Sequence, residues 1–145
     1  MREDPKRDQG KKKVNEGKIF PIPFTSVEIQ KNINLNTHFS SKPSKEKIIN
    51  QATEFHLKGN ISEAIKYYQY CLNQNFNEPQ VFANYGVILK SLGKLKDAEL
   101  SLRKATELKP DIAEAHLNLG LVLQDLGKLQ EAEISTRKAI ELKPG

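Results

Sequence analysis

Asparagine recurs in this chain at a regular spacing that could place several amide groups in one binding site. Asn50, Asn84 and Asn118 follow one another at a constant interval along the chain. A primary amide both donates and accepts hydrogen bonds, so a column of amides can bind the backbone of an extended peptide by its shape rather than its sequence. The pattern predicts peptide recognition if a repeated structural element brings the three amides into register.

Catalysis and metal binding find little support among the other polar residues. The three histidines share no metal-ligand spacing, and the sequence contains no glycine-rich phosphate loop. Cys71 is the only cysteine, which excludes a disulfide, and we interpret it as a small buried residue rather than a nucleophile. Glu99 and Glu133 lie among lysines and arginines, where solvent-exposed ion pairs are expected. We therefore expect no enzyme activity, no cofactor and no bound metal.

Charge divides the chain into two unequal parts. The 145 residues carry a net charge of +5, with 37% hydrophobic and 28% charged residues. Residues 1–43 hold nine Lys or Arg against five Asp or Glu, whereas residues 44–145 hold fourteen against thirteen. The basic balance belongs to an arm and does not predict a nucleic-acid-binding surface. Since no apolar stretch suits a signal peptide or a membrane span, we expect a soluble, cytoplasmic protein that contacts neither nucleic acid nor membrane.

The basic arm, residues 1–43, is predicted to be mostly disordered. Its first part, residues 1–18, is polar and has no apolar period. The segment IFPIPF (19–24) carries prolines at alternate positions, which forbid a helix there. Residues 25–35 fit a strand or a single helical turn, and the sequence does not decide between the two.

The rest of the chain is repetitive. Three glycines recur at the same interval as the asparagines: Gly59, Gly93 and Gly127. Aligning them divides the chain into three units: residues 45–78 (unit one), 79–112 (unit two) and 113–145 (unit three). Units two and three share 17 of their 33 aligned residues, which excludes a chance similarity.

Each unit is predicted to hold two helices joined by a glycine turn. In unit two, the spacing of Phe82, Tyr85 and Leu89 places all three side chains on one face of the first helix. Small residues recur at matching places in the units, and two helices approach to about 8 Å only where side chains are short. Glycine suits the left-handed residue just past a helix, and Pro110 ends the second helix of unit two. The pattern predicts an all-α fold.

These residues resemble the tetratricopeptide repeat, a helix–turn–helix unit with a period of about 34 residues. Unit two carries the family's preferred positions as the following residues: Phe82, Tyr85, Gly86, Leu89, Ala98, Leu102, Ala105 and Pro110. Unit three follows the pattern with departures at His116 and Thr136, and unit one is the most divergent. The resemblance covers residues 45–145 and implies an all-α solenoid, a right-handed superhelix whose concave face is lined by the first helix of each unit.

The resemblance places the three asparagines on that concave face. The candidate peptide-binding residues are Asn50, Asn84, Asn118, Ile49, Leu117, Val87, Leu121 and Lys90. They combine amides and apolar side chains with little charge, which is typical of a peptide groove. Two alternatives stay open: asparagine could simply be common at this position of the family, and Ile49 and Leu117 could serve helix packing.

Some members of the family hold the acidic C-terminus of a chaperone with a two-carboxylate clamp. At the clamp positions this sequence has Ile49, Thr53, Asn84, Glu114 and Asn118. Only Asn84 matches, and Glu114 reverses a charge. The resemblance therefore does not favour a chaperone-tail function.

The sequence as a whole predicts a protein–protein interaction scaffold that binds an extended peptide or partner segment. The alternative is the N-terminal, substrate-recruiting region of a larger group-transfer enzyme, because a similar asparagine ladder occurs in O-linked N-acetylglucosamine transferases. Unit three lacks the polar outer face of a terminal repeat, and we expect Leu123, Ile140 and Leu142 to pack on a further helix. The chain is therefore expected to be a fragment of a longer array, or to self-associate through unit three.

Overall fold

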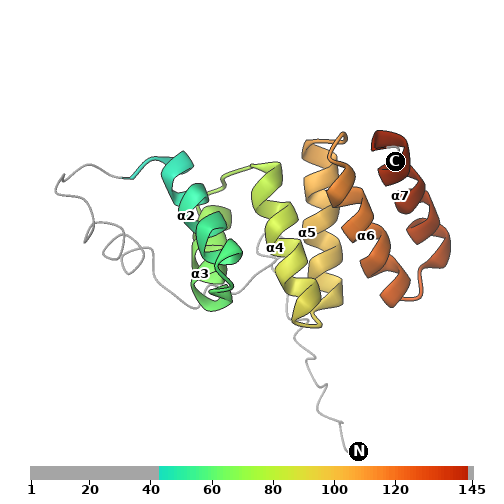
Figure 1. Ribbon diagram of the computed structural model, residues 1–145, viewed down its shortest axis with the longest axis horizontal. Helices are drawn as coiled ribbons and strands as arrows, with labels where there is room; N and C mark the ends of the chain where they lie inside the picture. The colour runs from blue at the N-terminus through green and yellow to red at the C-terminus, as the bar shows by residue number, and fades with distance from the viewer. Residues whose placement is uncertain (1–42, 144–145) are drawn as a thin grey trace, which may run out of the picture.

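The computed structural model describes residues 43–143, which form six α-helices (Figure 1). The helices come in three pairs: α2 (Lys45–Leu57) with α3 (Ile61–Asn73), α4 (Pro79–Ser91) with α5 (Leu95–Leu108), and α6 (Ala113–Asp125) with α7 (Leu129–Leu142). Each pair falls within one unit of the sequence repeat, and the predicted all-α helix–turn–helix fold is confirmed. The predictions for residues 1–42, including the disordered arm and the IFPIPF segment, lie outside the described residues.

Local sequence sets the ends of these helices. Ser44 is the N-cap of α2, and its hydroxyl oxygen accepts a hydrogen bond from the backbone N–H of Lys47 at 3.2 Å. The turn residues Gly59, Gly93 and Gly127 have φ angles of 75°, 75° and 76°, a left-handed conformation that glycine adopts without strain. The predicted glycine turns are therefore confirmed.

Glycines inside α4 and α6 let the two helices of a pair approach closely. A Cβ added to Gly86 would lie 2.6 Å from Cγ of Leu102 on α5. A Cβ added to Gly120 would lie 2.5 Å from Oγ1 of Thr136 on α7. Because neither place has room for a methyl group, glycine is required there by packing, as the pattern of small residues predicted.

A main apolar cluster runs through all six helices, and a smaller one consists of Phe82, Ala105 and Ala115. Leu123 of α6 belongs to the main cluster and is 0% exposed, on the same inward side of the helix as Leu119 four residues earlier. The expectation that Leu123 would wait for a further helix is therefore wrong, because it is enclosed within its own array. Ile140 of α7, in contrast, is 61% exposed.

The two junctions between units are built differently. The unit one–unit two junction joins α3 to α4 through residues 74–78, and the unit two–unit three junction joins α5 to α6 through residues 109–112. At the first, Asn75 has a left-handed φ of 55°, and the N–H of Phe76 bonds back to a carbonyl of α3 at 3.0 Å. At the second, the chain leaves α5 in an extended conformation, and α5 contacts α6 more extensively than α3 contacts α4.

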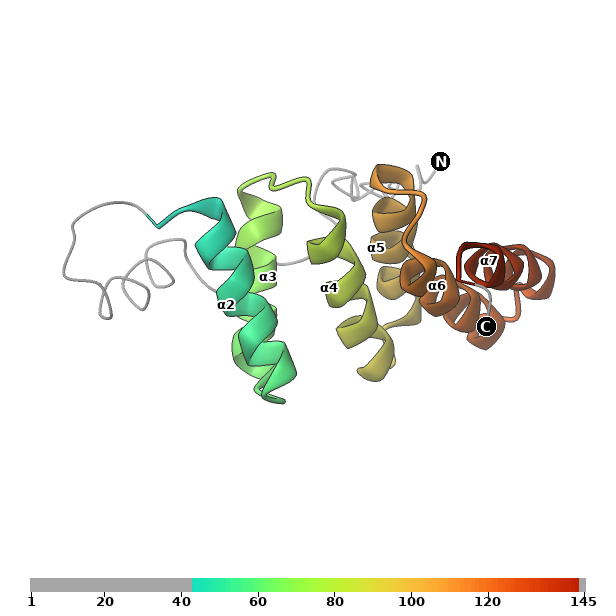
Figure 2. The ribbon, with the colours of Figure 1, turned by 45° about the horizontal axis from the view of Figure 1, so that its top comes forward.

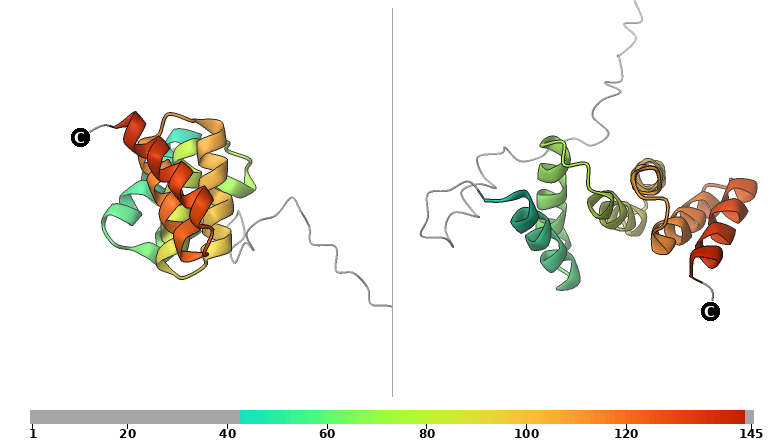
Figure 3. Two further views of the ribbon diagram at one scale, coloured as in Figure 1. Left: turned by 90° about the vertical axis from the view of Figure 1, so that its right-hand side faces the viewer. Right: turned by 90° about the horizontal axis from the view of Figure 1, so that it is seen from above.

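The pairs follow one another in a row from α2 to α7 (Figure 1) and turn progressively along that row (Figure 2). Seen from above, α2 and α4 lie on one side of the row and α3 and α5 on the other (Figure 3). Among the described helices, contacts form within a pair and between adjacent pairs. The arrangement is a superhelix in which each unit depends on its neighbours for burial.

Candidate functional site

The eight candidate residues all lie on α2, α4 and α6, the first helices of the three units. They are called the first-helix set: Ile49 and Asn50 on α2, Asn84, Val87 and Lys90 on α4, and Leu117, Asn118 and Leu121 on α6. Each asparagine stands at the same point of its helix, six residues into its unit. The superhelix therefore presents the amides at equivalent positions on successive first helices.

The three amides nevertheless have different surroundings. Asn50 is exposed, whereas Asn84 and Asn118 are half-buried. The Asn118 Nδ2 donates to the carbonyl oxygen of Glu114 on its own helix at 3.0 Å. This bond uses one of the two N–H groups of the amide and leaves its other N–H and its oxygen for a ligand.

Asn84 lies near the buried phenol of Tyr68, which projects from α3. Tyr68 is 0% exposed, and its hydroxyl meets no described partner within ordinary hydrogen-bond geometry. Burial raises the pKa of Tyr68, while the side chains of Thr53 and Asn84 act in the opposite direction. Sequence patterns carry no signal for this proximity, because it joins three helices from two units.

The exposed apolar surface of the set lies on α6. Leu117 and Leu121 are 44% and 38% exposed, and they stand one turn apart on the same side of the helix. Ile49 is partly buried and packs against the core, so the alternative of helix packing holds for Ile49. Val87 and Lys90 are half-buried. The set therefore offers an apolar pair beside the amide of unit three.

A charged cluster occupies the unit two–unit three junction, where the sequence predicted solvent-exposed ion pairs. Glu99 of α5 is 8% exposed, and both of its carboxylate oxygens accept hydrogen bonds from Lys128 Nζ at 3.0 Å. Arg103 donates to Glu99 at 2.9 Å and also pairs with Glu131 in the first turn of α7. The prediction is wrong for Glu99, because residues of unit three close over its carboxylate.

The charges around Glu99 determine its protonation. Burial alone would raise the pKa of Glu99, but hydrogen bonds from Lys128 and Arg103 outweigh it and hold the pKa below the ordinary value of 4.5. At the matching position of unit three, Glu133 pairs with Arg137 at 2.6 Å with 63% of its side chain exposed, as the sequence predicted. Position 21 of the repeat is therefore buried in unit two and open in unit three.

Comparison with known proteins places this architecture in a family. Family models match three stretches of the chain, described as TPR repeat (residues 86–127) and as tetratricopeptide repeat (residues 113–145 and 52–73). The chain belongs to the tetratricopeptide repeat family. None of the curated proteins matches its sequence.

Solved tetratricopeptide repeat structures share the fold. The TPR domain of Arabidopsis OM64 is 20% identical with a TM-score of 0.64, over 69% of this chain and 83% of that chain. The first TPR of Spaghetti (RPAP3), bound to the HSP90 peptide SRMEEVD, is 23% identical with a TM-score of 0.64, over 70% and 80% of the two chains. MamA is 19% identical with a TM-score of 0.67, over 81% of this chain and 64% of that chain. At these identities the likeness establishes the fold.

Two side chains of the tetratricopeptide repeat units that could carry chemistry have structural surroundings. Cys71 of α3 is 0% exposed, and burial raises the pKa of its thiol to about 12, so the thiol stays protonated at neutral pH. His116 Nε2 lies 2.8 Å from the carbonyl oxygen of Pro110, which ties α6 to the loop before it. Within residues 43–143, no group of His, Cys, Asp and Glu side chains could hold a metal ion. The same residues contain no helix long and apolar enough to cross a membrane.

Proposed function

We propose that this tetratricopeptide repeat domain binds an extended segment of a partner protein on the first-helix set. The observation that carries the proposal is the amide and leucine pair on α6. Asn118 keeps one N–H and its oxygen available beside the exposed side chains of Leu117 and Leu121. The amide can bond the backbone of a peptide while the leucines accept an apolar side chain.

The chemistry of the set favours a ligand with little charge. Lys90 is its single charged member, and Asn50 adds an exposed amide on α2. The Spaghetti structure holds an acidic peptide, but the clamp positions of this chain carry Ile49 and Thr53, and Glu114 adds a negative charge. We therefore propose a neutral or apolar segment as the ligand and expect SRMEEVD to bind weakly or not at all.

The second interpretation, a substrate-recruiting region of a larger group-transfer enzyme, rests on the family resemblance. No described residue favours it over a non-catalytic scaffold. Both interpretations require the first-helix set to bind polypeptide, so the same binding experiment tests the part that they share.

The experiment is a selection from a displayed library of random peptides against the whole chain. A recovered peptide is then measured by calorimetry against the wild type and three single variants. Asn118→Ala and Leu121→Ala should each weaken binding about tenfold, because each removes one polar or apolar contact. The matched control is Asn73→Ala, which removes an exposed asparagine from the end of a second helix, α3.

The proposal fails if the library yields no peptide, or if Asn118→Ala and Leu121→Ala bind as tightly as the wild type while keeping their helical circular dichroism. Equal weakening by Asn73→Ala would also place the ligand elsewhere. The SRMEEVD peptide is measured alongside, and binding as tight as that of the selected peptide would contradict the proposed ligand chemistry.

A further inference from the structure

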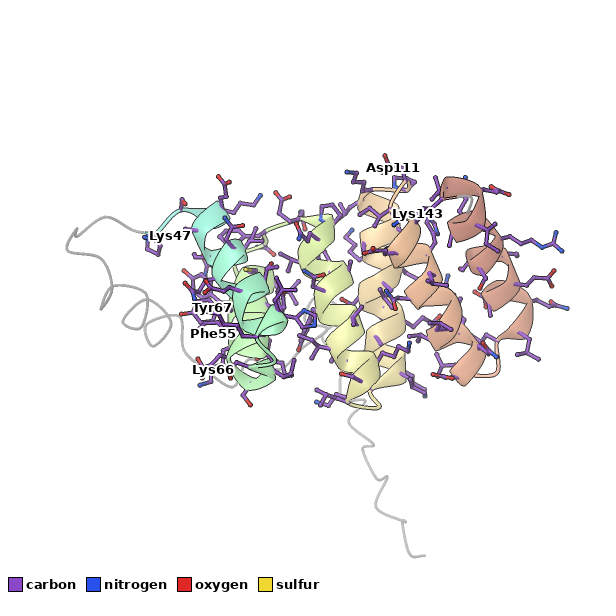
Figure 4. The ribbon with its side chains drawn as sticks, in the orientation of Figure 1. Lys47, Phe55, Lys66, Tyr67, Asp111 and Lys143 are labelled. Carbon is purple, nitrogen blue, oxygen red and sulfur yellow. The ribbon has the colours of Figure 1, made fainter. Side chains whose placement is uncertain are left out.

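One face of α7 carries a stripe of four residues with mixed chemistry, here called the α7 stripe: Leu129, Glu133, Arg137 and Ile140. Their spacing of four, four and three residues places them along one side of the helix over about 16 Å. All four are open to solvent: Leu129 and Ile140 are 65% and 61% exposed, and the side chains of Glu133 and Arg137 are 63% and 73% exposed. α7 lies at one end of the row of helices (Figure 3), and side chains on its outer side point away from the other helices (Figure 4).

The equivalent face of α5, one repeat earlier, shows that residues at these positions can form a contact between units. The same positions of α5 hold Leu95, Glu99, Arg103 and Thr106. There Glu99 is 8% exposed because Lys128 of unit three lies against it, and Leu95 packs against the core. Since α5 uses this side to contact another unit, the matching side of α7 has the chemistry of a contact surface. Among the described residues, nothing makes the corresponding contact with α7.

The order of the stripe makes it complementary to itself. Read from the N-terminal end it runs apolar, negative, positive, apolar. Laid antiparallel against a second α7, Glu133 faces Arg137 of the second copy and Leu129 faces Ile140 of the second copy. The apolar pair and the charged pair have nearly the same midpoint along the helix, so a single two-fold axis near residue 135 creates all four pairs.

We propose that two copies of the chain associate through their α7 stripes in this antiparallel arrangement. The contact is isologous, so each charge pair and each apolar pair forms twice, and the dimer closes without leaving a stripe free. Its centre resembles the unit two–unit three junction, where Glu99 and Arg103 form ion pairs with residues of unit three. The first-helix set lies on α2, α4 and α6, so the dimer would hold two peptide sites.

The test is the mass of the whole chain in solution. Sedimentation equilibrium or light scattering is run over protein concentrations from about 1 µM to about 1 mM, which spans the range in which small interfaces associate. The wild type should change from monomer to dimer within this range. Glu133→Arg should raise the dissociation constant at least about tenfold, because it places two positive charges opposite each other at two symmetric sites.

Two further variants separate pairing from a general effect of charge. The double variant Glu133→Arg with Arg137→Glu exchanges the two charges and should restore the dimer, since the exchanged stripe is again self-complementary. Glu107→Arg makes the same change of charge on α5, where the side chain is 72% exposed, and should leave the dissociation constant unchanged. Circular dichroism confirms that each variant keeps its helices.

Three results would overturn the proposal. A wild type that stays monomeric at every concentration leaves the stripe to another occupant, such as a further repeat or the N-terminal arm. A dimer that tolerates Glu133→Arg uses another face. Association that continues beyond the dimer indicates a head-to-tail contact instead of a two-fold one.

Discussion

The two junctions between units place different chemistry at the same positions of the repeat. At the unit one–unit two junction, positions 21 and 25 are Ile65 and Gln69 of α3. Gln69 is 7% exposed and its Nε2 donates to the Tyr85 hydroxyl at 3.0 Å. The ring of Tyr68 lies 6.3 Å from that of Tyr85, and Ile65 packs against the core. This junction is aromatic and buried, and Phe55 and Tyr67 make a separate ring contact within unit one (Figure 4).

At the unit two–unit three junction the same two positions are Glu99 and Arg103, and they meet Lys128 and Glu131 of unit three. The period of the repeat therefore fixes where units touch but not how they are held together. Unit two has charged residues at the positions of Lys128 and Glu131, namely Lys94 and Asp97. At the positions of Glu99 and Arg103, however, unit one has an isoleucine and a glutamine.

The difference specifies the order of the units. If unit three followed unit one directly, Lys128 and Glu131 would face Ile65 and Gln69 and lose their charged partners. Specificity of this kind arises as much from the mismatches that it penalises as from the matches that it rewards. The changes below are arranged from the largest expected effect to the smallest, and all are measured by urea unfolding at a concentration where the chain is monomeric.

Removing the aromatic junction should cost the most. Tyr68→Ala deletes a ring that is 0% exposed, and a loss of about 3–5 kcal/mol in the free energy of unfolding is expected for an aromatic side chain at such a site. Tyr68→Phe is the control, and it should cost nothing because the hydroxyl has no bond of ordinary geometry to lose. A loss above about 1 kcal/mol in the control would show that the phenol bonds to Thr53 or Asn84 in solution.

Moving the charged junction into unit one tests whether the two chemistries are interchangeable. Ile65→Glu should destabilise the chain by about 2 kcal/mol, because a carboxylate replaces an apolar contact with the core. Adding Gln69→Arg, although it removes the bond to Tyr85, should recover about 1 kcal/mol through pairing with the new carboxylate and with Asp97. If the double variant is no more stable than Ile65→Glu, the aromatic surroundings do not accept an ion pair.

The charged junction should respond to salt, unlike the aromatic one. Glu99→Gln keeps the shape of the side chain and removes its charge, and we expect a loss of about 1–2 kcal/mol at low ionic strength. At about 1 M NaCl the loss should shrink, because screening then acts over about 3 Å. The loss caused by Tyr68→Ala should stay constant over the same range, and an equal salt dependence of both would contradict the comparison.

Acid should act on the same junction. The pKa of Glu99 is lower in the folded chain than its ordinary value of 4.5, so its ionised form stabilises the fold above that pH. This contribution is lost as the pH falls from 4.5 through the lowered folded pKa. Between about pH 5 and pH 3, the wild type should therefore lose more stability than Glu99→Gln does. Parallel pH profiles of the two proteins would rule out a lowered pKa at Glu99.

The smallest effect is expected at the matching position of unit three. Glu133→Gln removes a charge from an i,i+4 pair whose side chains are 63% and 73% exposed, and exposed pairs contribute about 0–0.5 kcal/mol. The same substitution at Glu99 should cost several times more. Equal losses at the two positions would mean that coverage by unit three adds nothing to the charged junction.

Sequence reasoning succeeded where a structural cause lies within one unit. The turn at Gly93 depends on its own backbone conformation, and the close approach at Gly86 depends on Leu102 of the same helix pair. The burial of Glu99 could not be read in this way, because Lys128 and Glu131 cover it from the next unit. A signal did exist: the Lys, the acidic residue and the Glu–Arg pair repeat in units two and three.

The sequence predicted where the candidate residues lie on the helices, but not how exposed each side chain is or what surrounds it. The period correctly placed all three asparagines on first helices at one register. It could not distinguish Asn50, which is exposed, from Asn84, which lies near the Tyr68 phenol. Asn84 lies beside position 24 of the unit before it, which is Tyr68, whereas the equivalent residue of the unit before Asn118 is Leu102, and no described helix precedes the one that carries Asn50. An aromatic side chain in one unit therefore changes the surroundings of the asparagine side chain in the next unit.

The restriction of contacts to neighbouring pairs has a consequence for synthesis on the ribosome. Unit one emerges first, and until α4 follows, Tyr68 and Gln69 lack the contacts with Tyr85 that cover them. A full unit takes about 2–7 s to be added at about 5–20 residues per second, whereas a helix pair forms far faster than that. The nascent chain therefore carries an aromatic surface in water for seconds at every round of translation, which is long enough for a chaperone to bind it. The charged junction made later exposes Glu99 and Arg103 instead, and these remain hydrated while they wait.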